Sequence, residues 1–347
     1  MRDSLAILHG ENLSVGDSLQ QPCSVLGAIC YSAGDTESRI LSDLNIPCLN
    51  VQMQRLDTTE PFCEVWHGSQ QMKQGRCGDI HYRHDDSLLF GVITLPETLF
   101  QPDTDKTPLQ QATESAYRQI FELLDQAHFP YLFRIWNYLA DINTHSFGQE
   151  RYHQFNRGRH DAFIAHGRDV AGNVPAACAL GFSQGPLTIA FLAGTVAPLN
   201  IENPRQISAC LYPPQYGPRS PTFSRASLVR LCQAEMLFIS GTASIVGHAT
   251  LHPTDVVAQT RETMANIKAV LIEANRHASQ QTFDLACLSY RVYVRHQVDL
   301  AQIRAELARC VGDSLKAVFL QADVCRHNLL LEIEATAILP TESGQVK

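Results

Sequence analysis

Apolar strands that alternate with amphipathic helices constrain the fold of this chain more than any other feature. Apolar residues recur at helical spacing over residues 256–274 and again over 300–311, and Asp255 is a plausible N-cap for the first of these helices. The strands predicted around them are residues 234–240, 282–294, 315–320 and 329–339. Elements in this order pack as layers, so we predict an α/β fold, a mixed sheet with helices packed on one face.

The first part of the chain is predicted to be rich in strands. Residues 1–107 contain turns and short apolar runs, and an amphipathic helix follows at 108–129, ending before Pro130. Further strands are predicted at 131–139 and within 178–199.

A polar stretch separates the two halves of the chain, and a short helix is predicted within it at residues 150–163. We therefore place an N-terminal sheet-rich domain at residues 1–145 and a C-terminal domain at 146–340. The last residues, 341–347, are expected to form a frayed tail.

The overall charge limits the classes of partner. A formal charge of −8 leaves no broad basic surface for the phosphate backbone of nucleic acid. A small anionic substrate is compatible with this negative net charge, because a few arginines in one pocket set the local potential. The most apolar stretch, residues 175–198, is interrupted by glycine, proline and polar residues at 181–186, which argues against a membrane span. We expect no nucleic-acid or membrane partner, and a monomer or a small homo-oligomer.

The cysteines indicate neither a disulfide framework nor a zinc ribbon. There are 11 of them, with no CxxC pair and no regular spacing, so we expect mostly buried thiols in a reducing compartment. The first 14 residues hold an apolar run of only four residues, which is too short for a secretory signal and favours a cytoplasmic location.

No cofactor or metal is predicted. The chain has no GxGxxG, Walker loop, HExxH or GxSxG in its expected surroundings. His248 and His252 lie four residues apart, but no further ligand has a recognisable spacing and Pro253 would break the helix that aligns them.

Two segments are candidates for binding an anion. Residues 151–159 concentrate three arginines with Tyr152 and an asparagine, a combination of donors that is suited to holding a planar carboxylate. Residues 211–225 form a loop that four prolines stiffen, and it presents Tyr212, Tyr216, Arg219 and Arg225. The alternatives are a solvated helix face for the first segment and an ordinary connection for the second.

A third segment leaves a predicted strand at residues 240–248. Gly241 would let a ligand approach the backbone closely, and Thr242 and Ser244 can donate hydrogen bonds to it. The alternative is a strand-end turn or bulge.

A pair of carboxylates near the end of the chain is the candidate catalytic group. Glu332 and Glu334 stand two residues apart in an apolar strand and share one face. Burial and a neighbouring carboxylate both raise a carboxyl pKa, so one of the two can remain protonated and act as a general acid. A solvent-facing pair is the alternative. Cys325 has the opposite parity, so only a bulge or bend lets it face the same pocket as Glu332.

These segments, in this order, resemble the chorismatase family, the enzymes that remove pyruvate from chorismate. The likeness spans most of residues 130–340, whereas the first hundred residues match only in general character. The motifs that carry it are FRIWNY (133–138), ERYHQFNRGR (150–159), YPPQYGPRSPTFSRA (212–226), SGTASIVGH (240–248), HPTDVVAQTRETMANI (252–267) and DVCRHNLLLEIEA (323–335). The resemblance implies a fold related to the Rid/YjgF proteins and chorismate mutase, with the active site in the C-terminal half.

The resemblance also implies roles for single residues. Glu332 matches the family's essential acid, which protonates the enolpyruvyl ether. Cys325 and Gly241 match the subgroup that aromatises the ring, whereas hydrolases carry alanine at the glycine position. The side chains expected to hold the two substrate carboxylates are Tyr152, Arg159, Tyr216, Arg219 and Arg225.

Several functions stay open from the sequence. We favour release of pyruvate with 3-hydroxybenzoate, with 4-hydroxybenzoate as a possible co-product. The first alternative is hydrolysis to pyruvate and a dihydroxycyclohexadiene carboxylate. The others are a Rid-like imine deaminase and a non-catalytic protein that binds a small molecule.

Overall fold

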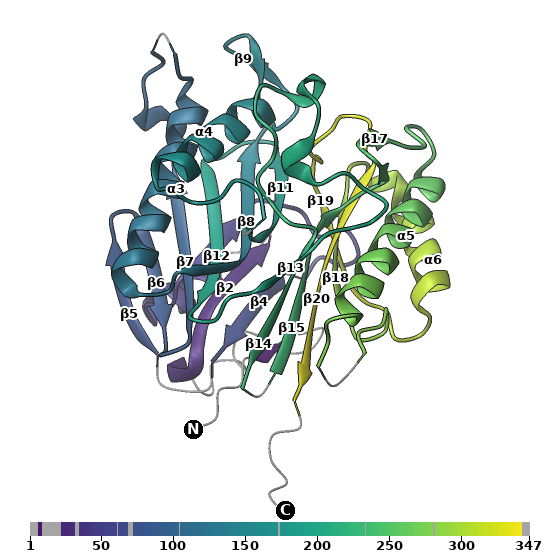
Figure 1. The fold of residues 1–347 in the computed structure, drawn as a ribbon, viewed down its shortest axis with the longest axis horizontal. Coiled ribbons are helices and arrows are strands. Elements are labelled where there is room, and N and C mark those ends of the chain that lie inside the picture. The colour runs from purple at the N-terminus through teal and green to yellow at the C-terminus, as the bar shows by residue number, and fades with distance from the viewer. Residues whose placement is uncertain are drawn as a thin grey trace, which may run out of the picture.

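The computed structural model describes residues 6–8, 22–31, 35–60, 62–68, 72–103, 105–172, 174–232, 234–279 and 282–341 (Figure 1). Its helices are α2 (Asp35–Asp43), α3 (Pro108–Ala127), α4 (Arg151–Ala165), α5 (Val256–Asn275) and α6 (Leu300–Val311). Short 3-10 turns are η1 (Pro22–Ser24), η2 (Glu97–Leu99), η3 (Ala209–Leu211), η4 (Pro214–Tyr216) and η5 (Gln297–Asp299).

One six-stranded sheet is built from the first half of the chain and has the order β11-β8-β12-β7-β6-β5. Its strands are β5 (Lys73–Cys77), β6 (Ile80–His84), β7 (Leu88–Leu95), β8 (Tyr131–Ala140), β11 (Ala176–Phe182) and β12 (Leu187–Gly194). Helices α3 and α4 cover one face of it, where apolar side chains from both layers form a common core. Burial of this core is the main source of stability for the layer.

A second six-stranded sheet has the order β13-β14-β15-β20-β18-β19. Its strands are β13 (Leu199–Ile201), β14 (Ala226–Leu231), β15 (Ala234–Thr242), β18 (Ser289–Val294), β19 (Lys316–Gln321) and β20 (Leu331–Pro340). Helices α5 and α6 pack on one face of this sheet through a second apolar core. Asp255 caps α5 as predicted, because its side chain accepts a hydrogen bond of 2.9 Å from the Ala258 amide.

A four-stranded sheet lies against both larger sheets. It has the order β1-β4-β2-β3, with β1 (Ala6–Leu8), β2 (Val25–Tyr31), β3 (Cys48–Val51) and β4 (Phe62–His67). The Trp66 ring of β4 contacts both Trp136 of β8 and Phe238 of β15, so one core joins all three sheets. Two small hairpins complete the strands, β9 (His145–Ser146) with β10 (Gln149–Glu150), and β16 (Ile245–Val246) with β17 (Ala249–Thr250).

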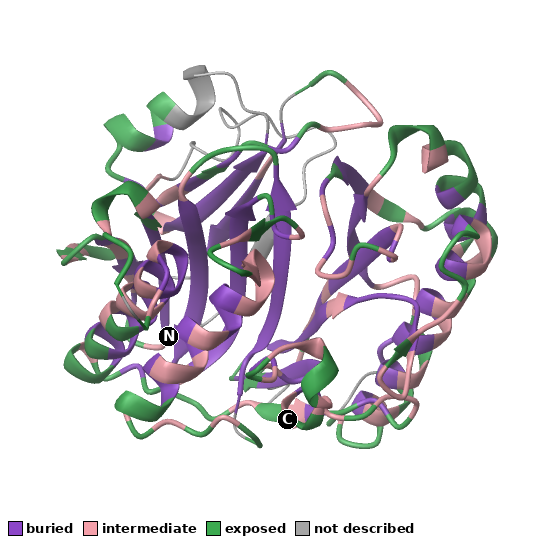
Figure 2. Ribbon diagram, turned by 90° about the horizontal axis from the view of Figure 1, so that it is seen from above, coloured by how far each residue is buried: buried purple, intermediate pink, exposed green. Residues whose placement is uncertain are grey.

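The predicted mixed α/β architecture is confirmed, and Figure 2 shows the buried strands in the interior with helices on the flanks. The strand predicted at 282–294 is shorter, since only β18 is extended and Asn275 binds the backbone of Phe283 before it. The sheets divide near residue 195 rather than at the expected boundary of 145/146, because β11 and β12 pair with β8 and β7. The domain boundary itself stays a prediction.

The cysteines differ from the expectation of mostly buried thiols. Cys30 and Cys63 face each other on β2 and β4 and form a disulfide. Of the cysteines described as free thiols, only Cys178 falls in the fully buried class. No helix in the described ranges is both long enough and apolar enough to span a bilayer.

Candidate active site

The edge strand β11 of the first sheet meets the second sheet along a narrow seam. Its backbone forms isolated bridges from Ala176 to Ser224 and from Gly181 to Asp323. The hydroxyl of Ser240 accepts a hydrogen bond of 2.9 Å from the Ala177 amide. These bonds hold the end of β15 and the segment before β20 against the first sheet.

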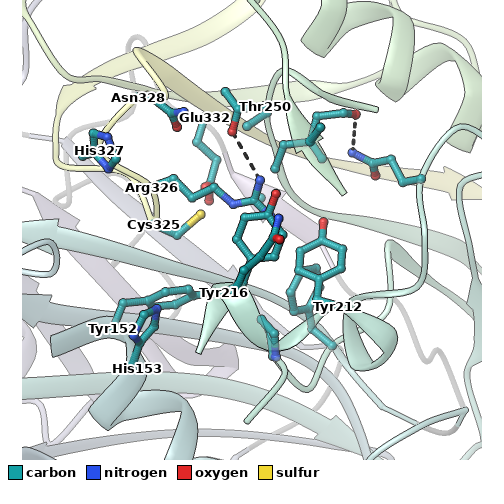
Figure 3. A pocket seen from close by; sticks show the side chains of 18 of the residues that line it. Tyr152, His153, Tyr212, Tyr216, Thr250, Cys325, Arg326, His327, Asn328 and Glu332 are labelled. Atoms are coloured by element: carbon teal, nitrogen blue, oxygen red, sulfur yellow. Dashed lines mark hydrogen bonds between the residues drawn. The ribbon is translucent and has the colours of Figure 1, made fainter. Parts of the chain in front are cut away.

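A cavity of about 440 Å³ opens at this seam, and a smaller recess of about 30 Å³ shares Tyr152, Phe223, Gly241, Cys325 and Glu332 with it. Four segments line the cavity: the start of α4, the 206–225 loop, the end of β15 with the β16–β17 hairpin, and residues 325–332. Figure 3 shows the side chains of Tyr152, Tyr216, Cys325, Arg326 and Glu332 around one space. The polar lining residues are Glu150, Tyr152, His153, Gln206, Tyr212, Gln215, Tyr216, Arg225, Thr250, Cys325, Arg326, His327, Asn328 and Glu332.

Glu332 of β20 is the acidic group at the inner part of the cavity. Its side chain is 4% exposed, and Glu334 on the same strand face is buried as well, so the solvent-facing alternative is wrong. Burial raises the pKa of Glu332 to about 8, the negative charge of Glu334 adds to this rise, and the Arg134 guanidinium opposes it. The carboxyl is therefore mostly protonated at neutral pH.

Gly241 lies directly against the Glu332 carboxyl. The pairing of β15 with β20 passes from Ile239–Ala335 to Thr242–Ile333, which leaves one extra residue in β15 and defines a β-bulge. A Cβ added to Gly241 would lie 1.9 Å from Glu332 Oε1. With the carboxyl in its present position a larger side chain at residue 241 does not fit, so the bulge at Gly241 provides the space that the carboxyl occupies.

Cys325 reaches the same cavity because residues 322–330 turn before β20 begins, which removes the parity conflict. Burial raises the pKa of the Cys325 thiol to about 12, and the neighbouring Glu332 contributes to the rise. The group is a neutral thiol at physiological pH. The thiol lies beside Glu332 and, as a weak donor, opposes the rise that burial causes in the pKa of that carboxyl, so it is suited to donating rather than to acting as a nucleophile.

Two arginines predicted from the sequence are buried at the site without a carboxylate partner. Arg159 is 2% exposed and lines the recess; it donates to Asn156 Oδ1 at 2.8 Å, and its Nε has no partner. Arg225 is 6% exposed and donates to the Ile207 carbonyl and to Tyr212 Oη at 2.7 and 3.0 Å. Within the described residues neither forms an ion pair with a carboxylate at contact distance, although burial raises the pKa of the nearby Glu202 and the charge of Arg225 opposes that rise. A buried charge without such a pair is costly unless a ligand completes it.

A third arginine, Arg326, was missed by the sequence reasoning. It follows Cys325 directly, and its guanidinium carbon lies 3.9 Å from the centroid of the Tyr216 ring. Its Nη1 donates to the His248 carbonyl at 2.8 Å and to Thr250 Oγ1 at 3.2 Å, while its buried Nη2 has no partner. Its position beside Cys325 was the signal that could have found it.

Three predicted binding residues do not line the cavity. Arg219 is exposed on the 211–225 loop. The Thr242 hydroxyl donates to the Ser240 carbonyl at 2.8 Å, and the Ser244 hydroxyl donates to the Leu251 carbonyl at 2.9 Å. Both hydroxyls are therefore used by the protein backbone, which corrects the expectation that they donate to a ligand.

The two histidines considered as metal ligands do not converge. His248 Nδ1 lies 3.2 Å from Tyr216 Oη, whereas His252 Nε2 lies 4.0 Å from a Glu262 oxygen. No group of three or more potential metal ligands was found in the part of the chain that the structure describes.

Comparison with known proteins identifies similar chains. Residues 64–193 match the family model described as chorismatase FkbO/Hyg5-like, N-terminal. A 3-hydroxybenzoate synthase from Streptomyces hygroscopicus is 35% identical over 324 residues, covering 91% of this chain and 92% of that protein. A chorismatase from the same organism is 36% identical, covering 90% and 88%. A crystal structure of a chorismatase superposes with a TM-score of 0.81 at 30% identity, covering 97% of this chain and 98% of the other.

Proposed function

The chain belongs to the chorismatase family, and we propose that it cleaves chorismate to pyruvate and 3-hydroxybenzoate. The observation that carries this proposal is the buried Glu332, whose pKa burial raises, at a cavity lined by arginines that form no ion pair with a carboxylate among the described residues. Chorismate carries two carboxylates and an acid-labile enol ether, so it needs both features. The cavity volume of about 440 Å³ lies in the range of small-molecule sites.

The arginines and tyrosines form two sets of hydrogen-bond donors that suit two carboxylates. Arg159 and Tyr152 lie at the recess, whereas Arg225, Arg326 and Tyr216 line the main cavity. An unpaired guanidinium binds a planar carboxylate through parallel hydrogen bonds. We propose that each set holds one substrate carboxylate.

Glu332 then supplies the chemistry. It donates its proton to the terminal methylene carbon of the enolpyruvyl group, which produces an oxocarbenium-like cation. The carboxylate left on Glu332 stabilises this cation until the neighbouring ring hydroxyl displaces the enolpyruvyl oxygen from its ring carbon. Pyruvate leaves with that oxygen, the hydroxyl oxygen then bridges two ring carbons, and its proton returns to Glu332. Opening of the bridge leaves one oxygen on the ring. Loss of a ring proton then completes aromatisation. Chorismate thereby divides into pyruvate and hydroxybenzoate without net consumption of water.

The choice of product rests on Gly241 and Cys325. Both match the aromatising subgroup, and the Gly241 bulge is where the Glu332 carboxyl lies. The neutral Cys325 thiol occupies the cavity wall beside the same carboxyl. These features favour 3-hydroxybenzoate over hydrolysis to the dihydrodiol, and 4-hydroxybenzoate is the second aromatic product to look for.

The competing functions use fewer of these groups. A Rid-like imine deaminase needs one arginine for a carboxylate and a positioned water, and it does not explain three arginines around the cavity. A non-catalytic binding protein does not need a buried, protonated glutamate.

The test is to incubate the purified protein with chorismate, without added metal or nucleotide. Products are resolved by chromatography and mass, with pyruvate assayed in parallel. We expect pyruvate with 3-hydroxybenzoate. Pyruvate with a dihydrodiol would replace the product assignment and keep Glu332 as the acid. Absence of pyruvate would return the deaminase and the binding protein to consideration.

A further inference from the structure

A buried ionic network lies beside the proposed general acid and takes no direct part in the mechanism. Glu334 accepts a hydrogen bond from Arg134 on one carboxylate oxygen; its other oxygen lies 2.5 Å from Arg291 Nη1 and 3.0 Å from Tyr293 Oη. Arg291 also pairs with Glu64. The four charged side chains are only 2% to 6% exposed.

The network joins three sheets at one point. Glu64 comes from β4, Arg134 from β8, and Arg291 and Glu334 from the neighbouring strands β18 and β20. Buried ion pairs of this kind contribute little net stability, since apolar side chains of similar volume often stabilise a core as well or better. A network of two carboxylates and two guanidinium groups is therefore expected to serve something besides folding.

The charge balance points to Glu332. Among the residues that the structure describes, Glu64 and Glu334 contribute two negative charges and Arg134 and Arg291 two positive charges, so these four groups balance one another without Glu332. An ionised Glu332, two residues from Glu334 on the same strand face, would add an unmatched negative charge in a buried region. For the four network groups and Glu332 taken together, the charges balance while Glu332 retains its proton.

Three of the other groups that face Glu332 carry no charge, and Arg159, which lines the same recess, is not among the charges that shift the pKa of Glu332. Cys325, Cys178 of β11 and Tyr152 of α4 are neutral, because burial raises the pKa of each of them. Arg159 lines the same recess and is the charge that the substrate carboxylate is proposed to neutralise.

We infer that Glu334 is a positioning residue for Glu332: locked as an anion between Arg134 and Arg291, it keeps the neighbouring acid protonated and ready to donate. This inference rests on the proposed function only for the use made of that proton. Arg134 has the opposite effect, because its positive charge favours ionised Glu332 and so lowers the pKa of that carboxyl. The ion pair between Arg134 and Glu334 weakens this effect.

The test follows the proton on Glu332 directly. The carboxylic-acid C=O band that is present in the wild type and lost in Glu332→Gln is titrated by infrared difference spectroscopy. In Glu334→Gln we expect the titration to move about one to two pH units lower, as removal of a charge two residues away predicts at a protein-like dielectric constant. In Arg134→Met we expect it to move higher. The alkaline limb of chorismate turnover moves in the same directions.

A control separates this effect from the general loss of a glutamate that bridges two arginines. Glu306 of α6 also bridges two arginines, Arg261 and Arg309, and lies outside both cavity linings. Glu306→Gln should leave the Glu332 titration unchanged. Arg134→Met retains the contact of Glu334 with Arg291, so it provides the test even where Glu334→Gln does not fold.

A Glu332 titration that coincides in wild type, Glu334→Gln and Arg134→Met would overturn the inference, as would shifts of the two variants in the same direction. Because the infrared titration needs no turnover, it remains decisive where chorismate is not the substrate. Conversely, turnover without a shift would leave the proposed function standing and remove the role of Glu334.

Discussion

Replacement of Gly241 by alanine tests how closely the acid is positioned. The new Cβ would lie 1.9 Å from Glu332 Oε1 and 2.7 Å from its carboxyl carbon, whereas real Cβ contacts below 3.0 Å are essentially absent. The carboxyl must therefore retreat by about 1 Å, and a misplacement of that size costs roughly 100-fold in rate. We expect kcat for pyruvate release to fall by about that factor.

The same displacement opens space beside the cationic intermediate, so we expect the remaining product to shift from 3-hydroxybenzoate toward the dihydrodiol. The assay measures pyruvate release under saturating chorismate and resolves both ring products by chromatography. Thr242→Ser is the matched control, because it alters the adjacent residue of the same bulge and keeps the hydroxyl bond to the Ser240 carbonyl. A Gly241→Ala enzyme with wild-type rate and wild-type product ratio would refute the reasoning.

Three further predictions concern the acid and the arginines. Glu332→Gln should lower kcat by about 10²- to 10⁴-fold while chorismate still binds in calorimetry; unchanged turnover would contradict the mechanism. Because the protonated form of Glu332 is the active one and burial raises its pKa to about 8, kcat should stay level through neutral pH and fall above about pH 8; a rate that rises there would be inconsistent with a general acid. Arg159→Met should raise KM at least about 10-fold without lowering the melting temperature, since it removes a buried charge that lacks a carboxylate partner; a stable variant with an unaltered KM would exclude Arg159 from substrate binding.

Much of the fold follows from local sequence patterns. Periodic apolar residues predicted α3, α5 and α6, and the Asp255 cap is present. Local patterns did not predict where the chain passes from the first six-stranded sheet to the second. That point depends on β11 and β12 pairing with strands far away in the chain. Nothing in a local pattern specifies which distant strand becomes the neighbour.

The residue types of the site were predictable from the sequence. The directions in which their side chains point were less predictable. Clustered arginines indicated two anion-binding segments, and the family resemblance assigned the role to Arg159 and Arg225 within them; both are buried at the seam. Thr242 and Ser244 were assigned to a ligand although their hydroxyls bond to backbone carbonyls. Arg326 was overlooked because only the turn before β20 brings it over the Tyr216 ring.

The most direct test of the central claim, proton transfer from Glu332 to carbon, is turnover in deuterium oxide. The carboxylic-acid proton of Glu332 exchanges with solvent, so protonation of the methylene carbon places one deuterium in the methyl group of pyruvate. Reducing pyruvate to lactate as it forms prevents later exchange, and mass spectrometry reads the label. We predict one deuterium in the methyl group for each turnover. Pyruvate formed without deuterium in its methyl group would contradict the account.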